Sequence, residues 1–309
     1  MTNNWPKMLI SATGPIRRDK LDGAALGMGE WGAQTRALAD EGLVPPDMLT
    51  GLTLFLLSSQ PRDQNRKQDI PGGGGGVAGG VWVRERFTIH RPLARDDAFT
   101  VSGESVGRHV HKGRRYGTTS SETFNAAGDR VATNLTTGLL QYKVQEGLAD
   151  TVEGRSADEV AAPEPDKSRA ADNSCLARLE RLRAGQAFAG APVRVSLDLM
   201  EARDTKKPDN PIHSDPELAK KAGLSRPIAG GSHVLAFALE VVMAEVGRQA
   251  LMHGANFDIR WKAPVHADSV IHPHARVVEA GEGRVVFDVD AVLDSGATAM
   301  IGRITVPLP

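Results

Sequence analysis

The chain has 309 residues, of which 40% are hydrophobic and 24% are charged, a composition typical of a globular protein that buries a core. Its 37 Lys and Arg residues balance 38 Asp and Glu residues, so there is no basic surplus for general nucleic-acid binding. The single cysteine, Cys175, excludes intrachain disulfides and cysteine-based metal sites. The chain shows neither a signal-peptide pattern nor an apolar run long enough to span a bilayer, so we expect a cytoplasmic protein, and its length favours two domains.

The first 80 residues contain two helical patterns and one glycine-rich stretch. Ala24–Asp40 is typical of a polar helix, and the leucine-rich Pro46–Ser58 is the candidate central helix of the first half. Ile70–Gly80 includes five consecutive glycines, Gly72–Gly76. No Gly-Lys-Ser/Thr follows them, so we predict a flexible loop rather than a phosphate-binding loop.

An internal repeat relates the two halves of the chain. Phe87–Asp96 resembles Phe257–Asp268, and both patterns predict a strand that enters a Pro-apolar turn closed by an aspartate. A hairpin follows in each half, with its turn at Gly128 or Gly296. The phenylalanines are 170 residues apart and the glycines 168. This long, nearly constant offset indicates two whole domains of one fold.

The pattern of the second half indicates what that fold is. Val285–Leu293 alternates apolar and polar residues, as in an antiparallel strand with one buried face. Ser232–Val246 is apolar almost all round, so its helix must be enclosed. We therefore predict an α+β protein of two tandem hotdog domains, each a curved antiparallel sheet wrapped around a central helix. The expected boundaries are 1–145 for the first domain, 146–172 for an acidic, proline-bearing linker and 173–309 for the second.

The densest functional signal lies just before the second buried helix. Asp215 is a good N-cap and Gly223 a good terminator for a short helix, which places His213 on a loop at the rim of a cleft. Gly230 and Gly231 begin the buried helix, where bare backbone N–H groups can stabilise the oxyanion of a thioester carbonyl. The alternatives are an ordinary loop histidine and glycines that only permit close helix–sheet packing.

Asn210-Pro211-Ile212-His213 and the later Ile228-Ala229-Gly230-Gly231 carry a family resemblance. They resemble the Gly-Asp-x-Asn-Pro-x-His and Ile-Ala-His-Gly signatures of MaoC-like dehydratases and type-2 (R)-specific enoyl-CoA hydratases. The likeness extends to Trp261–Val265 and Ala299–Pro307, so it covers the C-terminal half. The N-terminal half matches only through the repeat, as in double-hotdog members whose first domain has lost the motif and shapes the acyl tunnel.

The resemblance implies an acyl-thioester hydro-lyase of fatty acid metabolism. Such an enzyme hydrates 2-enoyl-CoA with (R) specificity, or dehydrates 3-hydroxyacyl-CoA or the corresponding acyl carrier protein (ACP) thioester. The resemblance assigns acid/base catalysis to His213, loop orientation to Asn210 and the oxyanion hole to Gly231. The chain departs from the family at Pro208, which stands where the family has its catalytic Asp. Asp209, one residue along, is the candidate replacement.

The remaining expectations concern the residues that bind the substrate, the cofactors and the oligomeric state. Arg226, Arg260 and Lys262 are candidates for the phosphates of coenzyme A or for an acidic carrier protein, with solvated strand edges as the alternative. The resemblance implies no metal or redox cofactor, and His272-Pro273-His274 lacks a third ligand at metal-site spacing. A homodimer is favoured, and a monomer stays open.

Two other functions fit the same sequence features. A hotdog thioesterase would use the acyl-thioester pocket to direct water at the carbonyl carbon. A non-catalytic acyl-CoA-binding protein would keep the pocket, and Pro208 would then mark the loss of the catalytic pair.

Overall fold

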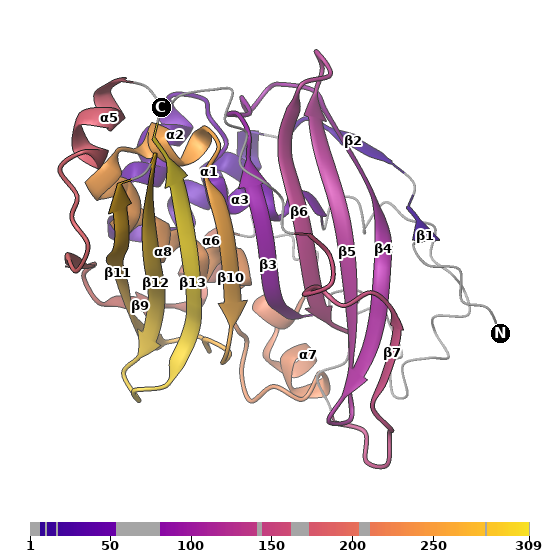
Figure 1. Ribbon diagram of the computed structural model, residues 1–309. Helices are drawn as coiled ribbons and strands as arrows, with labels where there is room; N and C mark the ends of the chain where they lie inside the picture. The colour runs from indigo at the N-terminus through magenta and orange to yellow at the C-terminus, as the bar shows by residue number, and fades with distance from the viewer. Residues whose placement is uncertain are drawn as a thin grey trace.

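The structure is a computed structural model, and it describes residues 7–9, 11–16, 18–53, 81–140, 144–161, 173–203, 211–281 and 283–308. Within them, 13 strands form one antiparallel sheet in the order β1-β4-β5-β6-β3-β10-β13-β12-β11-β8, while β2 and β7 pair with β4 and β9 pairs with β11 (Figure 1). The strands are β1 (Lys7–Met8), β2 (Ala12–Gly14), β3 (Val81–Ile89), β4 (Phe99–His111), β5 (Arg114–Asn125), β6 (Arg130–Leu139), β7 (Thr151–Gly154), β8 (Ala187–Ala189), β9 (Val193–Val195), β10 (Asn256–Trp261), β11 (Ser269–Gly281), β12 (Arg284–Leu293) and β13 (Thr298–Pro307).

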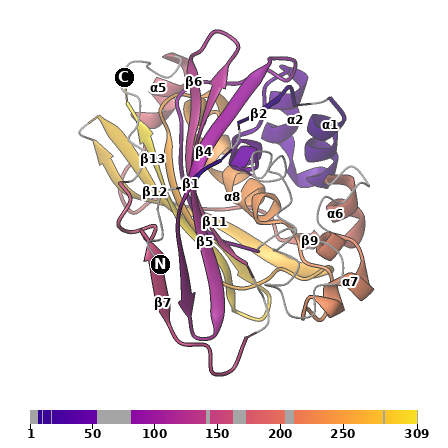
Figure 2. The same cartoon turned by 90° about the vertical axis from the view of Figure 1, so that its right-hand side faces the viewer.

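The helices α1, α2, α6 and α8 gather on one side of this sheet, as Figure 2 shows. The α-helices are α1 (Arg18–Gly27), α2 (Ala33–Asp40), α3 (Pro46–Thr50), α5 (Asn173–Leu179), α6 (Leu197–Arg203), α7 (Pro216–Lys221) and α8 (Gly231–Val246). The 3₁₀ helices are η1 (Gly29–Trp31), η3 (Pro211–His213) and η4 (Arg248–Met252). None of the helices in the described ranges has the length and hydropathy that a bilayer span requires.

The two halves meet where β3 pairs with β10. Phe87 lies directly opposite Phe257, and their rings stack with centroids 4.1 Å apart. The order outward from this pair is β6-β5-β4 on one side and β13-β12-β11 on the other. Both predicted hairpin turns are present, with Gly128 and Gly296 at φ of 80° and 81°, a conformation that glycine adopts without strain. The duplication and the double-hotdog fold are thus confirmed.

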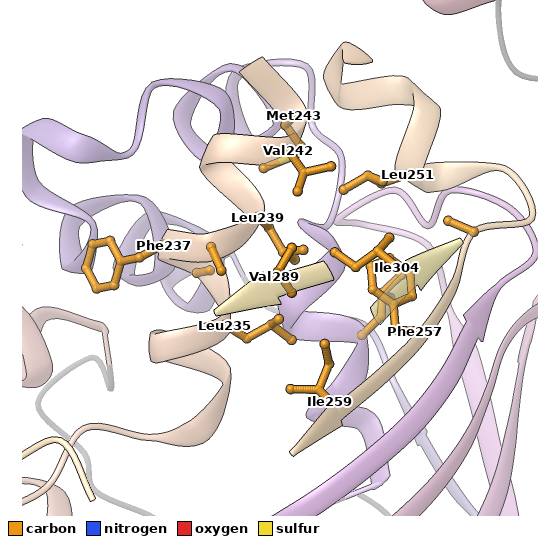
Figure 3. Close-up of a cluster of buried hydrophobic side chains, with 14 of the residues drawn as sticks. Leu235, Phe237, Leu239, Val242, Met243, Leu251, Phe257, Ile259, Val289 and Ile304 are labelled. Atoms are coloured by element: carbon orange, nitrogen blue, oxygen red, sulfur yellow. The ribbon is translucent and has the colours of Figure 1, made fainter. Parts of the chain in front are cut away.

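Helix α8 forms the centre of the hydrophobic core. Leu235 and Leu239 face Phe257 and Ile304 of the sheet, while Phe237 points away from the sheet (Figure 3). All five side chains are at most 2% exposed. Helices α2, α3 and α5 pack against α8 from its other sides. The predicted enclosed helix is confirmed, and each large side chain that it buries contributes about 1.5–3 kcal/mol.

The helices of the first half differ from the prediction. Ala24–Asp40 is not one helix, because η1 separates α1 from α2 and Gly29 there has φ of +56°. The backbone at Gly27 also approaches Arg203 so closely that a Cβ would lie 2.4 Å from the Arg203 Cβ. Of the predicted helix Pro46–Ser58, α3 begins at Pro46 and ends at Thr50; the part from residue 54 onward, and the glycine-rich loop up to Gly80, lie outside the described residues.

Part of the expected linker 146–172 belongs to the sheet. β7 pairs with β4, and the chain after it crosses the face of β3 that points away from α8. There Arg86 donates a hydrogen bond to the Val160 carbonyl at 2.8 Å, and Arg84 forms ion pairs with Asp158 and Asp258. A stretch poor in large apolar residues is therefore fixed by backbone pairing and arginine contacts rather than by a core of its own.

Candidate active site

The loop that carries His213 is held by the capped helix predicted after it. The Asp215 carboxylate accepts hydrogen bonds from the N–H groups of Glu217 and Leu218 at 2.8 and 3.0 Å, which caps α7. The helix stops at Gly223, with φ of +93°. Asp215 is thereby engaged as a structural cap.

The His213 ring is oriented by the backbone of Ile228. Its Nδ1 lies 2.6 Å from the Ile228 carbonyl oxygen, and the Ile228 N–H donates to the Ile212 carbonyl at 3.2 Å. Ile212 and Ile228 are buried together in a small apolar cluster under the loop. Because a carbonyl only accepts, Nδ1 is the donor in this contact and Nε2 is left as the ring nitrogen that can take up a proton.

The same segment is fixed from its other side by the turn after β10. The Ala229 N–H donates to the Val265 carbonyl at 2.8 Å, and the Ala267 N–H donates to the Pro227 carbonyl at 2.9 Å. Residues 227–229 therefore lie between His213 and the turn at 265–267. This arrangement brings His213 to the start of α8.

The first turn of α8 presents backbone donors at this point. The Gly230 carbonyl accepts hydrogen bonds from the N–H groups of His233 and Val234, whereas the N–H groups of Gly231 and Ser232 lie too early in the helix to have an acceptor within it. The Gly231 carbonyl accepts a hydrogen bond from Trp261 Nε1 at 3.0 Å.

Close packing explains the glycine at 231. A Cβ there would lie 2.9 Å from the ring of Trp261, whereas a Cβ at Gly230 would meet nothing within 4 Å. The alternative of close helix–sheet packing thus holds at Gly231. An oxyanion donor needs the same unshielded backbone N–H. Close packing therefore does not decide between the two roles, and the oxyanion role of Gly231 stays a proposal.

His233, two residues further on, is the core histidine that the sequence led us to expect. It is 1% exposed, its Nε2 lies 2.7 Å from the Gly27 carbonyl, and its ring stacks on Phe237. Burial lowers its pKa well below the usual range, so the ring is neutral. Its hydrogen bond joins α8 to α1.

Sequence reasoning missed a buried ion pair at the same helix end. Arg203, the last residue of α6, pairs with Asp47 of α3, and both side chains are at most 7% exposed. The Arg203 guanidinium also lies 3.5 Å from the Ser232 carbonyl in the first turn of α8. Asp47 directly follows two prolines at a helix start, which indicates an ordinary N-terminal acid. Nothing in the sequence pairs it with an arginine 156 residues away.

The three predicted phosphate-binding residues fall in two places. Arg226 and Lys262 are exposed and lie on the two segments that flank the start of α8. Arg260 lies opposite Arg84, on the face of the sheet that points away from α8, since its neighbour Ile259 faces the core. The structure therefore does not bring Arg260 to His213.

Pro208, Asp209 and Asn210 lie outside the described residues, so the roles expected of Asp209 and Asn210 stay predictions. Between His213 and the carboxylates of the described ranges, the structure records no hydrogen bond or ion pair. The described residues also include no group of three or more metal-ligating side chains placed to hold an ion.

The histidines at 272 and 274 are engaged elsewhere. Each pairs with an aspartate of the neighbouring hairpin, His272 with Asp294 at 2.6 Å and His274 with Asp290 at 2.8 Å.

Comparisons with known proteins agree with this architecture. The model of the MaoC-like domain family matches residues 208–296, and a search of curated proteins found no match. Among similar solved structures, a MaoC-like dehydratase has a TM-score of 0.67 at 18% identity, covering 98% of both chains. A Mycobacterium tuberculosis protein described as having a double hotdog fold has a TM-score of 0.63 at 13% identity, covering 97% of this chain and 96% of its own.

A third solved structure, a putative oleoyl thioesterase from Lactobacillus plantarum, has a TM-score of 0.55 at 12% identity, covering 99% of this chain and 98% of its own. Likeness at such identities establishes the fold alone. The chain therefore has the double-hotdog fold, and its residues 208–296 match the model of the MaoC-like domain family.

Proposed function

We propose that the chain is an acyl-thioester hydro-lyase. It adds water with (R) specificity to a 2-enoyl-CoA, or removes water from a 3-hydroxyacyl-CoA or ACP thioester. The observation that carries the proposal is the fixed orientation of His213: Nδ1 is engaged by the Ile228 carbonyl, which leaves Nε2, beside the start of α8, without a hydrogen-bond partner among the residues that the structure describes. This histidine stands within the stretch that matches the MaoC-like domain.

The proposed reaction needs one base, one acid and one oxyanion site. His213 Nε2 and a carboxylate hold a water molecule, whose oxygen bonds to C3 of the enoyl chain. C2 takes up a proton, the C2–C3 double bond becomes single, and the product has gained one H₂O. The N–H of Gly231 donates to the thioester oxygen while negative charge develops there. Asn210 orients the loop.

The carboxylate is proposed to come from residues 204–210, the segment before His213 in sequence. Asp215 is engaged in capping α7, and Asp47 is paired with Arg203. Residues 204–210 start directly after Arg203, which the ion pair fixes beside the first turn of α8. Asp209 belongs to this segment of the sequence, next to the position where the family places its acid, and is the residue that we assign.

The substrate is proposed to enter past two cations. Arg226 and Lys262 flank the start of α8 and suit the phosphates of coenzyme A or an acidic carrier protein. Arg260 takes no part, because it lies on the opposite face of the sheet. We expect no metal or redox cofactor, and a homodimer as the oligomeric state.

A thioesterase is the second candidate, because a putative oleoyl thioesterase shares the fold over nearly the whole chain. In that reaction water attacks the carbonyl carbon and coenzyme A leaves as the free thiol. The third candidate is a binding protein without catalysis, favoured by Pro208 in place of the family acid.

One assay separates the three candidates. Purified protein is incubated with crotonyl-CoA and trans-2-octenoyl-CoA, and both the enoyl absorbance and free thiol are followed. We expect loss of enoyl absorbance without thiol release, and a large loss of rate in His213→Ala and Asp209→Ala. The control is His272→Ala, which removes a half-exposed histidine paired with Asp294 and should leave the rate unchanged.

The other outcomes select the other candidates. Thiol release without hydration indicates a thioesterase. Binding of acyl-CoA without either reaction indicates a binding protein. Hydration that survives His213→Ala refutes the mechanism proposed here.

A further inference from the structure

The sheet face that points toward the helices is polar in the N-terminal half of the sheet, at positions where it is apolar in the C-terminal half. The register of β3, β5 and β6 matches that of β10, β12 and β13, which allows each inward position to be compared with its counterpart. The matched pairs are Asn134 with Ile304, Thr136 with Val306, Ser121 with Phe287, Thr123 with Val289, and Thr119 with Val285. All ten side chains are buried. The first half thus replaces five apolar residues of the second by five polar ones.

A buried carboxyl lies among these polar residues. Glu85 is fully buried, and its Oε1 accepts hydrogen bonds from Asn134 Nδ2 at 2.9 Å and Thr136 Oγ1 at 3.2 Å. From the helical side, Thr53 Oγ1 lies 2.9 Å from Ser121 Oγ. We name the set formed by Glu85, Asn134, Thr136, Thr53, Ser121 and Thr123 the polar cluster.

Three atoms of the polar cluster lack a hydrogen-bond partner within the part of the chain that the structure describes. They are Glu85 Oε2, Asn134 Oδ1 and Thr123 Oγ1, and all three are buried. An unsatisfied buried polar group is costly, so three in one place call for a ligand or a function. Burial raises the pKa of Glu85 to about 8, so at neutral pH its carboxyl is mainly protonated and Oε2 carries a donor. Asn134 Oδ1 is an acceptor beside it.

Strand β3 connects the polar cluster to the proposed active site. Its first residue, Val81, packs against the small apolar cluster beneath the His213 loop. The next residue, Trp82, contacts Trp261, whose indole lies against Gly231. Glu85 follows Val81 by four residues, about 13 Å along a strand. Strand β3 and the two tryptophans thus mark the direction from Gly231 to Glu85.

We propose that the polar cluster binds a hydroxyl group on the acyl chain, remote from the thioester carbonyl, and so selects hydroxylated acyl thioesters over plain alkyl ones. This inference rests on the proposed function for the position of the thioester. A hydroxyl suits the unpaired atoms because it accepts from the Glu85 carboxyl and donates to Asn134 Oδ1. An alkyl chain in the same place leaves both groups unsatisfied, and sites built to hydrogen-bond a hydroxyl discriminate strongly against analogues that lack it.

The test compares two saturated ligands of equal length that cannot undergo hydration, octanoyl-CoA and 8-hydroxyoctanoyl-CoA, by titration calorimetry on the full chain, with free thiol followed to detect any hydrolysis. We expect the hydroxylated ligand to bind at least about 10-fold more tightly, about 1.4 kcal/mol. The preference should fall to within about 3-fold in Glu85→Leu and in Asn134→Leu. Thr118→Val is the matched control, because Thr118 is a buried threonine of β5 that bonds Thr137 outside the polar cluster, and it should keep the wild-type preference.

The binding assay is independent of catalysis, so the two proposals fail separately. Equal affinities in the wild-type chain, as expected if only internal water occupies the polar cluster, overturn the inference whether or not the protein hydrates enoyl-CoA. A hydroxyl preference in a protein without hydratase activity supports the inference and refutes the hydro-lyase. Because the decisive comparison uses the wild-type chain, misfolding of a variant does not affect it.

Discussion

The buried carboxyl of Glu85 predicts a specific dependence of folding stability on pH. Burial raises its pKa from the ordinary value for a glutamate to about 8, and the hydrogen bonds from Asn134 and Thr136 oppose that rise only in part. Between these two pKa values the folded protein holds a proton that the unfolded chain has lost. Folding stability therefore falls as the pH rises, because ionisation favours the unfolded state.

The magnitude follows from the width of this interval. The contribution is fully present below the unfolded pKa and is lost as the pH rises through about 8. At 1.36 kcal/mol per pKa unit, the loss between pH 5 and pH 9 amounts to about 4 kcal/mol. Glu85→Gln keeps the shape of the side chain and an acceptor for Asn134 and Thr136, but it has no titrating group.

Urea unfolding at pH 5, 7 and 9 measures this contribution. Other groups titrate in both proteins, so the quantity of interest is the difference between wild type and Glu85→Gln. We expect the wild type to lose about 4 kcal/mol more than the variant between pH 5 and pH 9. Parallel pH profiles for the two proteins would refute the assignment of a protonated, buried Glu85.

Three further predictions concern the start of α8. His213→Ala should lower kcat/KM for enoyl-CoA hydration by about 10²–10⁴-fold, with unchanged circular dichroism, and a smaller loss would contradict a role as acid or base. Gly231→Ala should destabilise the fold by about 1–3 kcal/mol in thermal unfolding, because the added Cβ would lie 2.9 Å from the indole of Trp261. Gly230→Ala is the control and should cost no more than about 1 kcal/mol, because a Cβ there meets nothing within 4 Å. Equal costs for the two variants would refute the packing argument. Arg203→Met should cost about 3–5 kcal/mol by leaving Asp47 buried without a countercharge, and Asp47→Asn in the same chain should recover part of that loss; without recovery, the ion pair is not the cause.

Much of the fold was predictable because its signals are local or repeated. The alternation of β12, the apolar circumference of α8 and the spacing of Phe87 and Phe257 each follow from side-chain periodicity. The capped helix α7 was predictable because Asp215 and Gly223 act on residues two or three positions away. The break between α1 and α2 was missed, because glycine is tolerated within helical patterns and the cause at Gly27 is its contact with the distant Arg203.

In the candidate site too, the local features were predictable from the sequence and the long-range contacts were not. The motif around His213 was visible in the sequence, but the orientation of its ring depends on the carbonyl of Ile228, 15 residues away. Arg226 and Arg260 looked equivalent in sequence, yet Arg260 lies on the outer face beside Arg84. Strand alternation decides on which face a residue lies, but only the packing of α8 decides which face carries the site.

The sequence by itself determined the duplicated hotdog plan, the buried central helix of the second half and the loop that carries the proposed catalytic histidine. These features depend on periodicity and on short-range capping, which neighbouring residues encode. Only the tertiary structure decided that Asp47 meets Arg203 and that Glu85 of β3 meets residues of β5 and β6 in the polar cluster. Such pairings depend on long-range register and on burial, which change the pKa and the partners of a side chain without any mark in the residues beside it.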